Sequence, residues 1–331
     1  MAHFTSRSLL PLPVYVKKIL LVKTSSLGDV VHSFPVIADI RQRFPQASID
    51  WVVEEAYAPL VELSPGVRRA IPVAIRRWRG RLLGAATWRE IGELKRLIRA
   101  ERYDDVIDTQ GLLKSALIAA AARGRRHGFD AASAREPIAA RFYDVVHHVA
   151  RDQHAVSRNR QLAAEALGYR VREPADYAMG IDRSLGQRGD RIVFLHATSR
   201  ADKHWPEASW MELGRLLERR GLRIVLPWGT ERERERSRRI AAGLQSAEVP
   251  QGLPLRAMAD LLALAKGVVG VDTGLVHLAA AMGIPAAAIY CATDPRLTGI
   301  HGCAHSVNLG GLHRMPSPQE VVEGLFACGA L

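Results

Sequence analysis

The sequence predicts an α/β protein with two Rossmann-like domains that face each other across a cleft. Short β-rich segments alternate with longer amphipathic segments, as strands and crossover helices do in a parallel sheet. This alternation stops in a polar, irregular stretch at about residues 170–185 and then starts again. The chain has 331 residues, which is enough for two domains with a core each. We therefore place the domains at residues 1–175 and 176–331.

The elements of the first half follow from hydrophobic periodicity. Short runs rich in apolar and β-branched residues predict strands at residues 18–23, 49–53, 69–74 and 104–110. Apolar residues with the 3.6-residue period of a helix predict helices at residues 29–43, 87–101, 112–123 and 153–167. Gly168 follows the last of these, and glycine is the residue type that most often ends a helix.

The second half repeats the pattern. Strands are predicted at residues 191–198, 223–228, 267–272 and 286–291. Helices are predicted at residues 206–220, 231–244, 255–264 and 274–282. Because each half contains strands alternating with helices, each is expected to form its own parallel sheet.

The composition is typical of a soluble globular protein, with 48% hydrophobic and 24% charged residues. No apolar run reaches the roughly 18 to 20 residues that a membrane-spanning helix needs. Pro11 and Pro13 interrupt the apolar stretch near the N-terminus, and no small-residue cleavage site follows, which argues against a secretory signal. Cys291, Cys303 and Cys328 match no metal or disulfide spacing. We therefore expect a protein of the reducing cytoplasm.

The formal net charge of +12 is concentrated in the first half. Residues 1–175 contain 28 Lys and Arg against 18 Asp and Glu, whereas residues 176–331 contain 18 against 16. This asymmetry indicates either a solvated basic surface or a first domain that binds a polyanion, such as nucleic acid, an anionic lipid or a glycan. Binding to nucleic acid rests on charge alone, because no recognisable motif accompanies it. The basic helix at residues 87–101 faces the core or lies near an anionic membrane.

Familiar phosphate-binding motifs are missing. No G-x-x-x-x-G-K-[ST] occurs, and no G-x-G-x-x-G follows the first strand of either half. The chain also has no Asp-x-Asp pair to hold a divalent metal against a diphosphate. A nucleotide would therefore need cationic side chains and helix N-termini.

The second half contains both features at two predicted strand ends. Thr198, Ser199 and Lys203 follow one strand, while Asp272, Thr273 and Gly274 follow another and lead into a helix with His277 in its first turn. The carboxyl ends of strands in an open α/β sheet form the edge at which ligands bind, and backbone N–H groups at a helix N-terminus bind phosphate. The alternatives are a helix cap for Asp272, a surface position for His277 and a solvated loop lysine.

The first half contains clustered cations. Arg76, Arg77, Arg79 and Arg81 surround Trp78 within six residues, and arginine forks bind carboxylates and phosphates bidentately. Further polar residues lie at the C-terminal end of the strand at residues 104–110 or after it. They either point into the cleft or serve locally as a helix cap and an ion pair. They are Asp108, Gln110, Lys114, Arg135 and Glu136.

Asp29 is the unexpected residue of a strand-to-helix turn, TSSLGDVVH. The turn predicts a helix that begins with Asp29, where a carboxylate would repel a phosphate. The residue is therefore a simple helix cap or serves another purpose. His147, His148 and His154 fit no metal-ligand spacing, so we interpret them as structural or solvent-facing.

The motifs together resemble a known family. The segments KTSSLGDVVH, RRWR, DTQGLLKSA, AREP, HATSRADKHWP, LPWG, VDTGLVHLAAA and ATDP are similar to those of bacterial ADP-heptose:lipopolysaccharide heptosyltransferases of type I. The resemblance runs from about residue 18 to the C-terminus. Type II enzymes share the strand, Gly-Asp and helix opening but lack the KTSS, RRWR and ADKHWP wording. The chain departs from the family pattern at Ser199, where threonine is expected, and at Gly80, where a basic residue is expected.

The resemblance implies a GT-B glycosyltransferase of two domains that transfers L-glycero-D-manno-heptose from ADP-heptose to the first Kdo of Kdo-lipid A, with inversion and without a metal cofactor. It implies a protein at the cytoplasmic face of the inner membrane, bound peripherally, with no nucleic-acid partner. Asp29 is then the general base, and Lys203 stabilises the charge that develops on ADP. The implied donor contacts are Thr198, Ser199, Lys203, Glu233, Asp272, Thr273, Gly274 and His277, and the implied acceptor contacts are Arg76, Arg77, Arg79, Lys114 and Arg135. The alternative from another class is a non-catalytic protein that binds nucleotides or anionic glycans.

Overall fold

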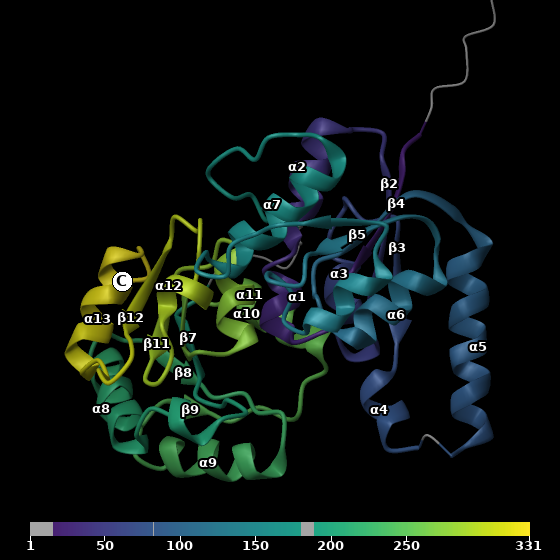
Figure 1. Cartoon of the computed structure of the whole chain (residues 1–331). Helices are drawn as coiled ribbons and strands as arrows, with labels where there is room; N and C mark the ends of the chain where they lie inside the picture. Colours follow the sequence, from purple (N-terminus) through teal and green to yellow (C-terminus); the bar gives the residue numbers. More distant parts are fainter. Residues whose placement is uncertain (1–15, 82, 180–188) are drawn as a thin grey trace, which may run out of the picture.

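The computed structural model describes residues 16–81, 83–179 and 189–331. It contains two six-stranded parallel sheets with helices on their faces, one sheet in each half of the chain (Figure 1). The α/β class and the two separate sheets predicted from the sequence are therefore confirmed. Part of the predicted linker, residues 180–185, lies outside the described residues, and the boundary at residue 175 stays a prediction.

The first sheet has the strand order β3-β2-β1-β4-β5-β6, the order of a doubly wound α/β fold. Every neighbouring pair is parallel. The strands are β1 (Lys18–Val22), β2 (Ser48–Glu54), β3 (Arg69–Val73), β4 (Arg102–Asp108), β5 (Arg123–Phe129) and β6 (Val145–His147).

The second sheet repeats this arrangement, with the order β12-β11-β10-β7-β8-β9 and parallel pairs throughout. Its strands are β7 (Arg191–Leu195), β8 (Arg223–Val225), β9 (Ala247–Glu248), β10 (Gly267–Val271), β11 (Ala286–Tyr290) and β12 (Ser306–Gly310). In both sheets the chain reverses its direction of winding beside the first strand, where such folds bind ligands.

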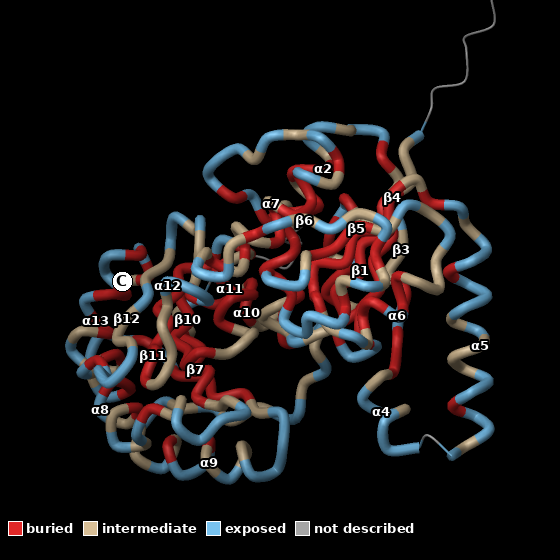
Figure 2. Tube along the Cα trace, in the orientation of Figure 1, coloured by how far each residue is buried: buried red, intermediate tan, exposed pale blue. Residues whose placement is uncertain are grey.

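The apolar strands are buried on both faces, which explains their almost continuous hydrophobic runs. Ile19 and Leu21 of β1 belong to a core shared by the two halves, whereas Leu20 and Val22 point to the opposite face of the sheet. The shared core also includes Val193 of β7. Figure 2 shows both sheets buried, with exposed residues on the outer helices. The two halves are thus packed together beneath the cleft.

The helices of the first half are α1 (Leu27–Val31), α2 (Phe34–Arg43), α3 (Ala58–Val61), α4 (Ile75–Arg79), α5 (Ala85–Ala100), α6 (Leu113–Ala121) and α7 (Ala155–Leu167). The prediction of one helix over residues 29–43 is wrong, because the helix is interrupted at His32 and Ser33 and a second helix begins at Phe34. Pro35 lies in the first turn of α2. Its nitrogen has no hydrogen to bond to the preceding turn, so it tolerates only a helix start.

The helices of the second half are α8 (Glu207–Glu218), α9 (Glu231–Ala241), α10 (Leu255–Ala263), α11 (Gly274–Ala281), α12 (Pro295–Thr298) and α13 (Pro318–Ala327). Most of them begin and end within a few residues of their predicted bounds. Among the described residues, no helix is both long enough and apolar enough to span a membrane.

Several elements were not predicted. The most instructive is β5, because its sequence RGRRHGF is basic and lacks the apolar pattern of the other strands. It forms a strand because β4 and β6 offer hydrogen-bonding edges on both sides. Arg126 is also held by Asp144. Tertiary contacts therefore override local β-propensity here.

Candidate active site

A cleft of about 430 Å³ lies between the two halves, above their shared core. It is lined by the segments that follow β1, β7 and β10, which places the carboxyl ends of both sheets around one space. Most of the predicted site residues reach this cleft. Its lining includes Asp29, Arg76, Arg135, Thr198, Ser199, Lys203, Asp272, Thr273, Gly274 and His277.

The helices α1 and α11, which both contribute residues to the lining of this cleft, lie against each other (Figure 1). The contact is close because glycines stand on both sides of it. A Cβ atom built on Gly274 would lie 2.5 Å from Cγ of Leu27 and 2.8 Å from the backbone nitrogen of Gly28. The helix that contains Asp29 is thereby fixed directly against the helix that follows Asp272.

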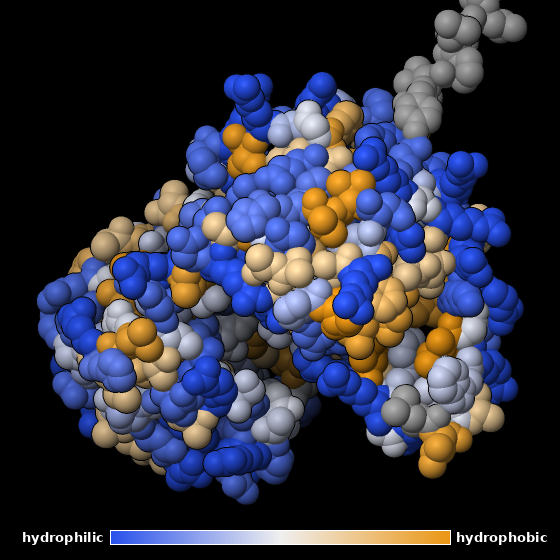
Figure 3. Space-filling view, in the orientation of Figure 1, coloured by the Kyte–Doolittle hydropathy of each residue, from blue (hydrophilic) through white to orange (hydrophobic). Residues whose placement is uncertain are grey.

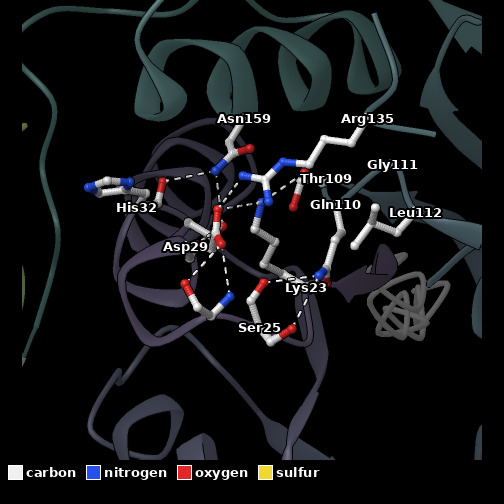
Figure 4. Close-up of polar contacts among 12 residues, drawn as sticks. Lys23, Ser25, Asp29, His32, Thr109, Gln110, Gly111, Leu112, Arg135 and Asn159 are labelled. Carbon is white, nitrogen blue, oxygen red and sulfur yellow. Dashed lines mark hydrogen bonds and ion pairs between the residues drawn. The ribbon is translucent and has the colours of Figure 1, made fainter. Parts of the chain in front are cut away.

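Asp29 is the third residue of α1, not the first as predicted, because the helix begins at Leu27. Its Oδ2 accepts hydrogen bonds from the backbone N–H of Ser26 at 2.8 Å and from the Ser26 hydroxyl at 3.1 Å. Its Oδ1 accepts a hydrogen bond from Nη2 of Arg135 at 2.7 Å, and Nζ of Lys23 lies 3.8 Å away. Figure 4 shows both cations pointing toward this carboxylate.

These two cations determine the ionisation of Asp29. Burial alone raises the pKa of its carboxyl group, but the charges of Lys23 and Arg135, together with the hydrogen bond from Ser26 and a contribution from His32, outweigh burial and lower the pKa to about 2. Burial also lowers the pKa of Lys23 to about 8, although the charge of Asp29 opposes this shift. Asp29 is therefore ionised at neutral pH, and it is a weak base while both cations remain close.

Lys23 was not predicted as a site residue, although it is a cation at the end of an apolar strand. Its ammonium donates to the carbonyl oxygen of Thr109 at 3.0 Å, and its side chain is buried. Beside it, Gln110 accepts hydrogen bonds from the backbone and hydroxyl groups of Thr24 and donates to the carbonyl of Ser25. The turn after β4 thus supports the turn after β1 (Figure 4).

Asp272 is the centre of the opposite wall. Its Oδ2 accepts hydrogen bonds from Lys203 at 2.6 Å and from Thr293 at 2.7 Å, while Nε2 of His277 lies 3.7 Å from Oδ1. Burial alone raises the pKa of this carboxyl group, but these contacts hold it well below the usual range. Asp272 is not the cap of α11, because that position is occupied by Thr273, and His277 is buried and not a surface residue. Both alternatives to a site role are therefore excluded.

A second cavity of about 340 Å³ adjoins the cleft and shares Leu27, Thr198, Ser199 and Thr273 with it. Its far end is apolar, with Trp228, Leu253 and Met258 among the lining residues. Glu233 also lines it, and its carboxylate accepts hydrogen bonds from the backbone N–H groups of Gly229 at 2.7 Å and Thr230 at 3.0 Å. Glu233 therefore shapes the loop before α9.

The predicted acceptor residues are only partly brought together. Arg76 lines the cleft and donates to the hydroxyl of Tyr57 at 2.6 Å. Lys114 donates to the Ser25 hydroxyl at 3.0 Å, beside Asp29. Arg79 is exposed on α4. Arg77 does not line the cleft and instead forms ion pairs with Glu55 and Glu90.

Four histidines, His32, His154, His277 and His301, form an interface histidine cluster between the halves. Nε2 of His32 lies 3.4 Å from Nδ1 of His277, and the rings of His154 and His301 stack. Of the other histidines considered above, His147 lies beside His127, and His148 is exposed next to Asp130. Within the described ranges, no group of three or more His, Cys, Asp or Glu side chains is arranged to hold a metal ion.

Comparisons with known proteins agree with this geometry. The family model for glycosyltransferase family 9 (heptosyltransferase) matches residues 91–327. Lipopolysaccharide heptosyltransferase 1 of Escherichia coli K12 is 47% identical over 290 residues, which are 86% of this chain and 91% of that protein. The corresponding protein of Pseudomonas aeruginosa is 47% identical over 88% of this chain and 83% of its own length.

Solved structures show the same arrangement. The E. coli heptosyltransferase WaaC with ADP superposes with a TM-score of 0.86 at 42% identity, covering 94% of this chain and 99% of that one. WaaC with ADP-2-deoxy-2-fluoro heptose gives a TM-score of 0.82. The predicted resemblance and the GT-B fold are thus confirmed, and this chain belongs to glycosyltransferase family 9, the enzymes that transfer heptose.

Proposed function

We propose that this enzyme transfers L-glycero-D-manno-heptose from ADP-heptose to the first Kdo sugar of Kdo-lipid A, with inversion, during synthesis of the lipopolysaccharide inner core. The relatives named lipopolysaccharide heptosyltransferase 1 from Escherichia coli K12 and Salmonella typhimurium support the type I assignment at 47% and 45% identity, whereas heptosyltransferase 2 of Salmonella typhimurium reaches 29%. The WaaC structures were solved with ADP and with a fluorinated ADP-heptose, which supports ADP-heptose as the donor.

The observation that carries this proposal is the ionised carboxylate of Asp29 at the edge of a cleft lined by both domains. In the proposed step, Asp29 accepts the proton of a Kdo hydroxyl while that oxygen attacks the anomeric carbon of the heptose. The bond between this carbon and the oxygen of ADP breaks, and the configuration inverts because the displacement is direct. A positioned base typically accelerates such a step by about 10² to 10⁴.

The leaving group is stabilised from the opposite wall. Lys203 has three N–H donors, of which one is directed to Asp272, so the others remain for the diphosphate. The backbone N–H groups at the start of α11 add positive potential at Thr273 and Gly274. Because these groups supply positive charge where negative charge develops, we propose that the reaction needs no metal cofactor.

Donor and acceptor occupy different parts of the site in this proposal. The adenosine of the donor lies in the second cavity, against Trp228 and Met258 and near Glu233, because that cavity combines an apolar end with polar groups toward the cleft. The anionic acceptor enters from the side of Arg76 and Arg135, with Arg79 and Lys114 nearby. Arg77 does not contact the acceptor directly in this proposal, because its guanidinium is already bound to two carboxylates.

We also propose that the enzyme lies on the cytoplasmic face of the inner membrane and binds that membrane through the surface of α4, α5 and α6. Only Thr87 and Ile98 of α5 are buried, although the helix has 16 residues. A groove of about 510 Å³ runs between these helices, with apolar walls and the cations Lys95, Arg99 and Lys114 among its lining. Figure 3 shows apolar surface around this hollow. Anionic lipid matches both properties.

A vesicle experiment tests the membrane proposal. Leu117 is 52% exposed in the groove, and Leu312, which is 56% exposed in the other domain, is the matched control. Leu117→Ser should reduce sedimentation with phosphatidylglycerol vesicles, while Leu312→Ser should not, because only the first removes apolar surface from the groove. If both variants sediment with the vesicles to the same extent as the wild type, the proposal is contradicted.

The assignment of Asp29 is tested with Asp29→Asn. The purified variant is assayed for ADP release with ADP-heptose and Kdo-lipid A in buffer without added metal. Turnover should fall at least about a hundredfold, because the amide cannot accept the proton, while calorimetry should show unchanged ADP affinity. An unchanged rate would exclude Asp29 as the base. Absence of transfer by the wild type, together with tight ADP binding, would favour the non-catalytic alternative.

Lys203→Met tests the role of the opposite wall. A hydrogen bond to a charged group typically contributes about 1.5–3 kcal/mol, so the rate at limiting donor should fall at least about tenfold. The rate with saturating donor and varied Kdo-lipid A separates this effect from a loss of acceptor binding. Wild-type kinetics at limiting donor would refute the proposed contact with the diphosphate.

A further inference from the structure

We propose that Arg135 acts as a latch on Asp29: its guanidinium blocks the carboxylate of Asp29 until the carboxylate of the acceptor sugar binds Arg135 in its place. This inference rests on the proposed function, because it takes Asp29 as the general base. It adds that the base is blocked in the free enzyme and is released by an acceptor that carries a negative charge beside its nucleophilic hydroxyl.

The hydrogen bonds of Asp29 show which contact must be broken before the carboxylate can accept a proton from substrate. Oδ2 is bound to the backbone N–H and the hydroxyl of Ser26, a capping contact that is part of the start of α1. Oδ1 is therefore the oxygen that can accept a proton from substrate. It is this oxygen that Arg135 binds at 2.7 Å.

Of the two cations beside Oδ1, only Arg135 is free to move. Lys23 is 4% exposed and is also bonded to the carbonyl of Thr109. The side chain of Arg135 is 49% exposed, and within the described ranges its guanidinium forms a hydrogen bond to Asp29 alone. Its backbone is held in place, because the backbone N–H of the next residue, Glu136, donates to the carbonyl oxygen of Gly111. A rotation of the Arg135 side chain is thus enough to open the contact.

The cleft offers the acceptor a route to this arginine. Arg135 and Arg76 both line it, and a carboxylate matches the two parallel N–H groups of a guanidinium. An acceptor carboxylate that replaces Asp29 on Arg135 keeps the guanidinium paired and brings the neighbouring hydroxyl toward Oδ1. That hydroxyl then gives its proton to Oδ1, its oxygen bonds to the anomeric carbon, and ADP leaves with the electron pair of the broken bond.

The charges around Asp29 support this exchange. The titratable and charged groups that face it are Lys23 after β1, Arg135 after β5, Lys114 of α6 and His32, the residue that caps the end of α1. Arg158 of α7 lies near both cations. When the acceptor neutralises Arg135, Asp29 loses one of its two strongest stabilising charges, and its basicity increases. Lys23 remains and keeps the carboxylate ionised at neutral pH.

The latch also protects the donor. A free carboxylate beside bound ADP-heptose would activate water as readily as a sugar hydroxyl and hydrolyse the donor. With Arg135 on Oδ1, activation is confined to complexes in which an anionic acceptor is present. Arg135 is in this respect a positioning residue and a determinant of acceptor specificity.

In the test, each of four enzymes is assayed with each of two acceptors. The acceptors are Kdo-lipid A with its acyl chains removed and the same molecule with the carboxyl group of the first Kdo reduced to an alcohol. The enzymes are the wild type, Arg135→Ala, Arg135→Lys and Arg223→Ala. Arg223 is a matched control, because it is 53% exposed and is likewise paired with an aspartate, Asp190, but far from the cleft at the start of β8.

The wild type should transfer heptose to the reduced acceptor at least about a hundredfold more slowly at saturation, because the latch stays closed. Arg135→Ala should use both acceptors with the same kcat, with a raised KM for the natural one. In the pH profile of kcat/KM for this variant, the acid limb should lie about one pH unit higher than in the wild type, since an adjacent arginine lowers a carboxyl pKa by about one to three units. Arg135→Lys should partly restore discrimination, and Arg223→Ala should behave as the wild type.

A second readout is hydrolysis of ADP-heptose without acceptor, which should be faster in Arg135→Ala than in the wild type. Equal losses on both acceptors, an unshifted acid limb and unchanged hydrolysis would overturn the inference, as would a wild type that does not discriminate between the acceptors. Failure of the proposed function is distinguishable, because then no enzyme transfers heptose to either acceptor at any pH. That result would overturn the latch as well, since no base would remain to be released.

Discussion

The close contact between α1 and α11 predicts that Gly274→Ala impairs catalysis by moving the base away from the donor. The new Cβ would lie 2.8 Å from the backbone nitrogen of Gly28, whereas ordinary van der Waals contact begins at 3.4 Å. A backbone atom cannot turn aside as a flexible side chain does, and Leu27 crowds the same position at 2.5 Å. The two helices must therefore separate by several tenths of an ångström.

The expected effect is large because both reacting partners depend on this contact. Misplacing reacting groups by about 1 Å costs up to about a hundredfold in rate, so kcat should fall between about tenfold and a hundredfold. Overpacking of this kind typically destabilises a protein by about 1–3 kcal/mol, which leaves the fold intact in a domain of ordinary stability. ADP affinity should fall much less than kcat, because the second cavity is built mainly from other residues.

The assay combines steady-state transfer at saturating substrates, calorimetry with ADP and thermal unfolding. Gly92→Ala is the control, because among the described residues a Cβ at that position would meet no atom within 4 Å apart from those of its own helix turn and chain neighbours. Gly28→Ala is a graded comparison, since its Cβ would lie 3.6 Å from Cδ2 of His277, within ordinary contact distance. The reasoning is refuted if Gly274→Ala keeps wild-type kcat, or if Gly28→Ala is the more severely impaired of the two.

Three further predictions follow from other contacts. Arg76→Ala should raise the KM for Kdo-lipid A, whereas Arg77→Ala should not, because only Arg76 lines the cleft; equal KM values in the two variants would contradict this. Arg160 is buried and bound to Asp39, so Arg160→Ala should reduce the free energy of unfolding by about 3–5 kcal/mol, measured in urea, and a loss below 1 kcal/mol would argue against the pair. Burial, with a contribution from His301, lowers the pKa of His154 to about 4, so the unfolded chain binds this proton first as the pH falls. The contribution of His154 to the free energy of unfolding should therefore be complete above pH 6.5 and decrease between pH 6.5 and 4, by about 2 kcal/mol at pH 5. A free energy of unfolding that does not change over this range would exclude this contribution.

The sequence alone determined the architecture and the positions of the chemistry. Strands such as β1 and β10 consist of continuous apolar runs, because a parallel strand is buried on both faces, and this pattern needs no knowledge of the partner strands. Asp272 was identified as a site candidate by its place at the carboxyl end of a strand, because the ends of parallel strands meet at one edge, whereas the role of Asp29 followed from the resemblance of its turn to the heptosyltransferase family.

Only the tertiary structure decided how these residues act on one another. Arg135 and Asp29 are separated by 106 positions, and Lys203 and Asp272 by 69, so no local pattern reports either ion pair. Lys23 was predicted only as the last residue of a strand, and β5 was not predicted. The tertiary structure shows that Lys23 is buried and that β5 pairs with β4 and β6. Hydrophobic periodicity records which face of an element is buried, but the strength of a base depends on charges brought beside it from distant parts of the chain.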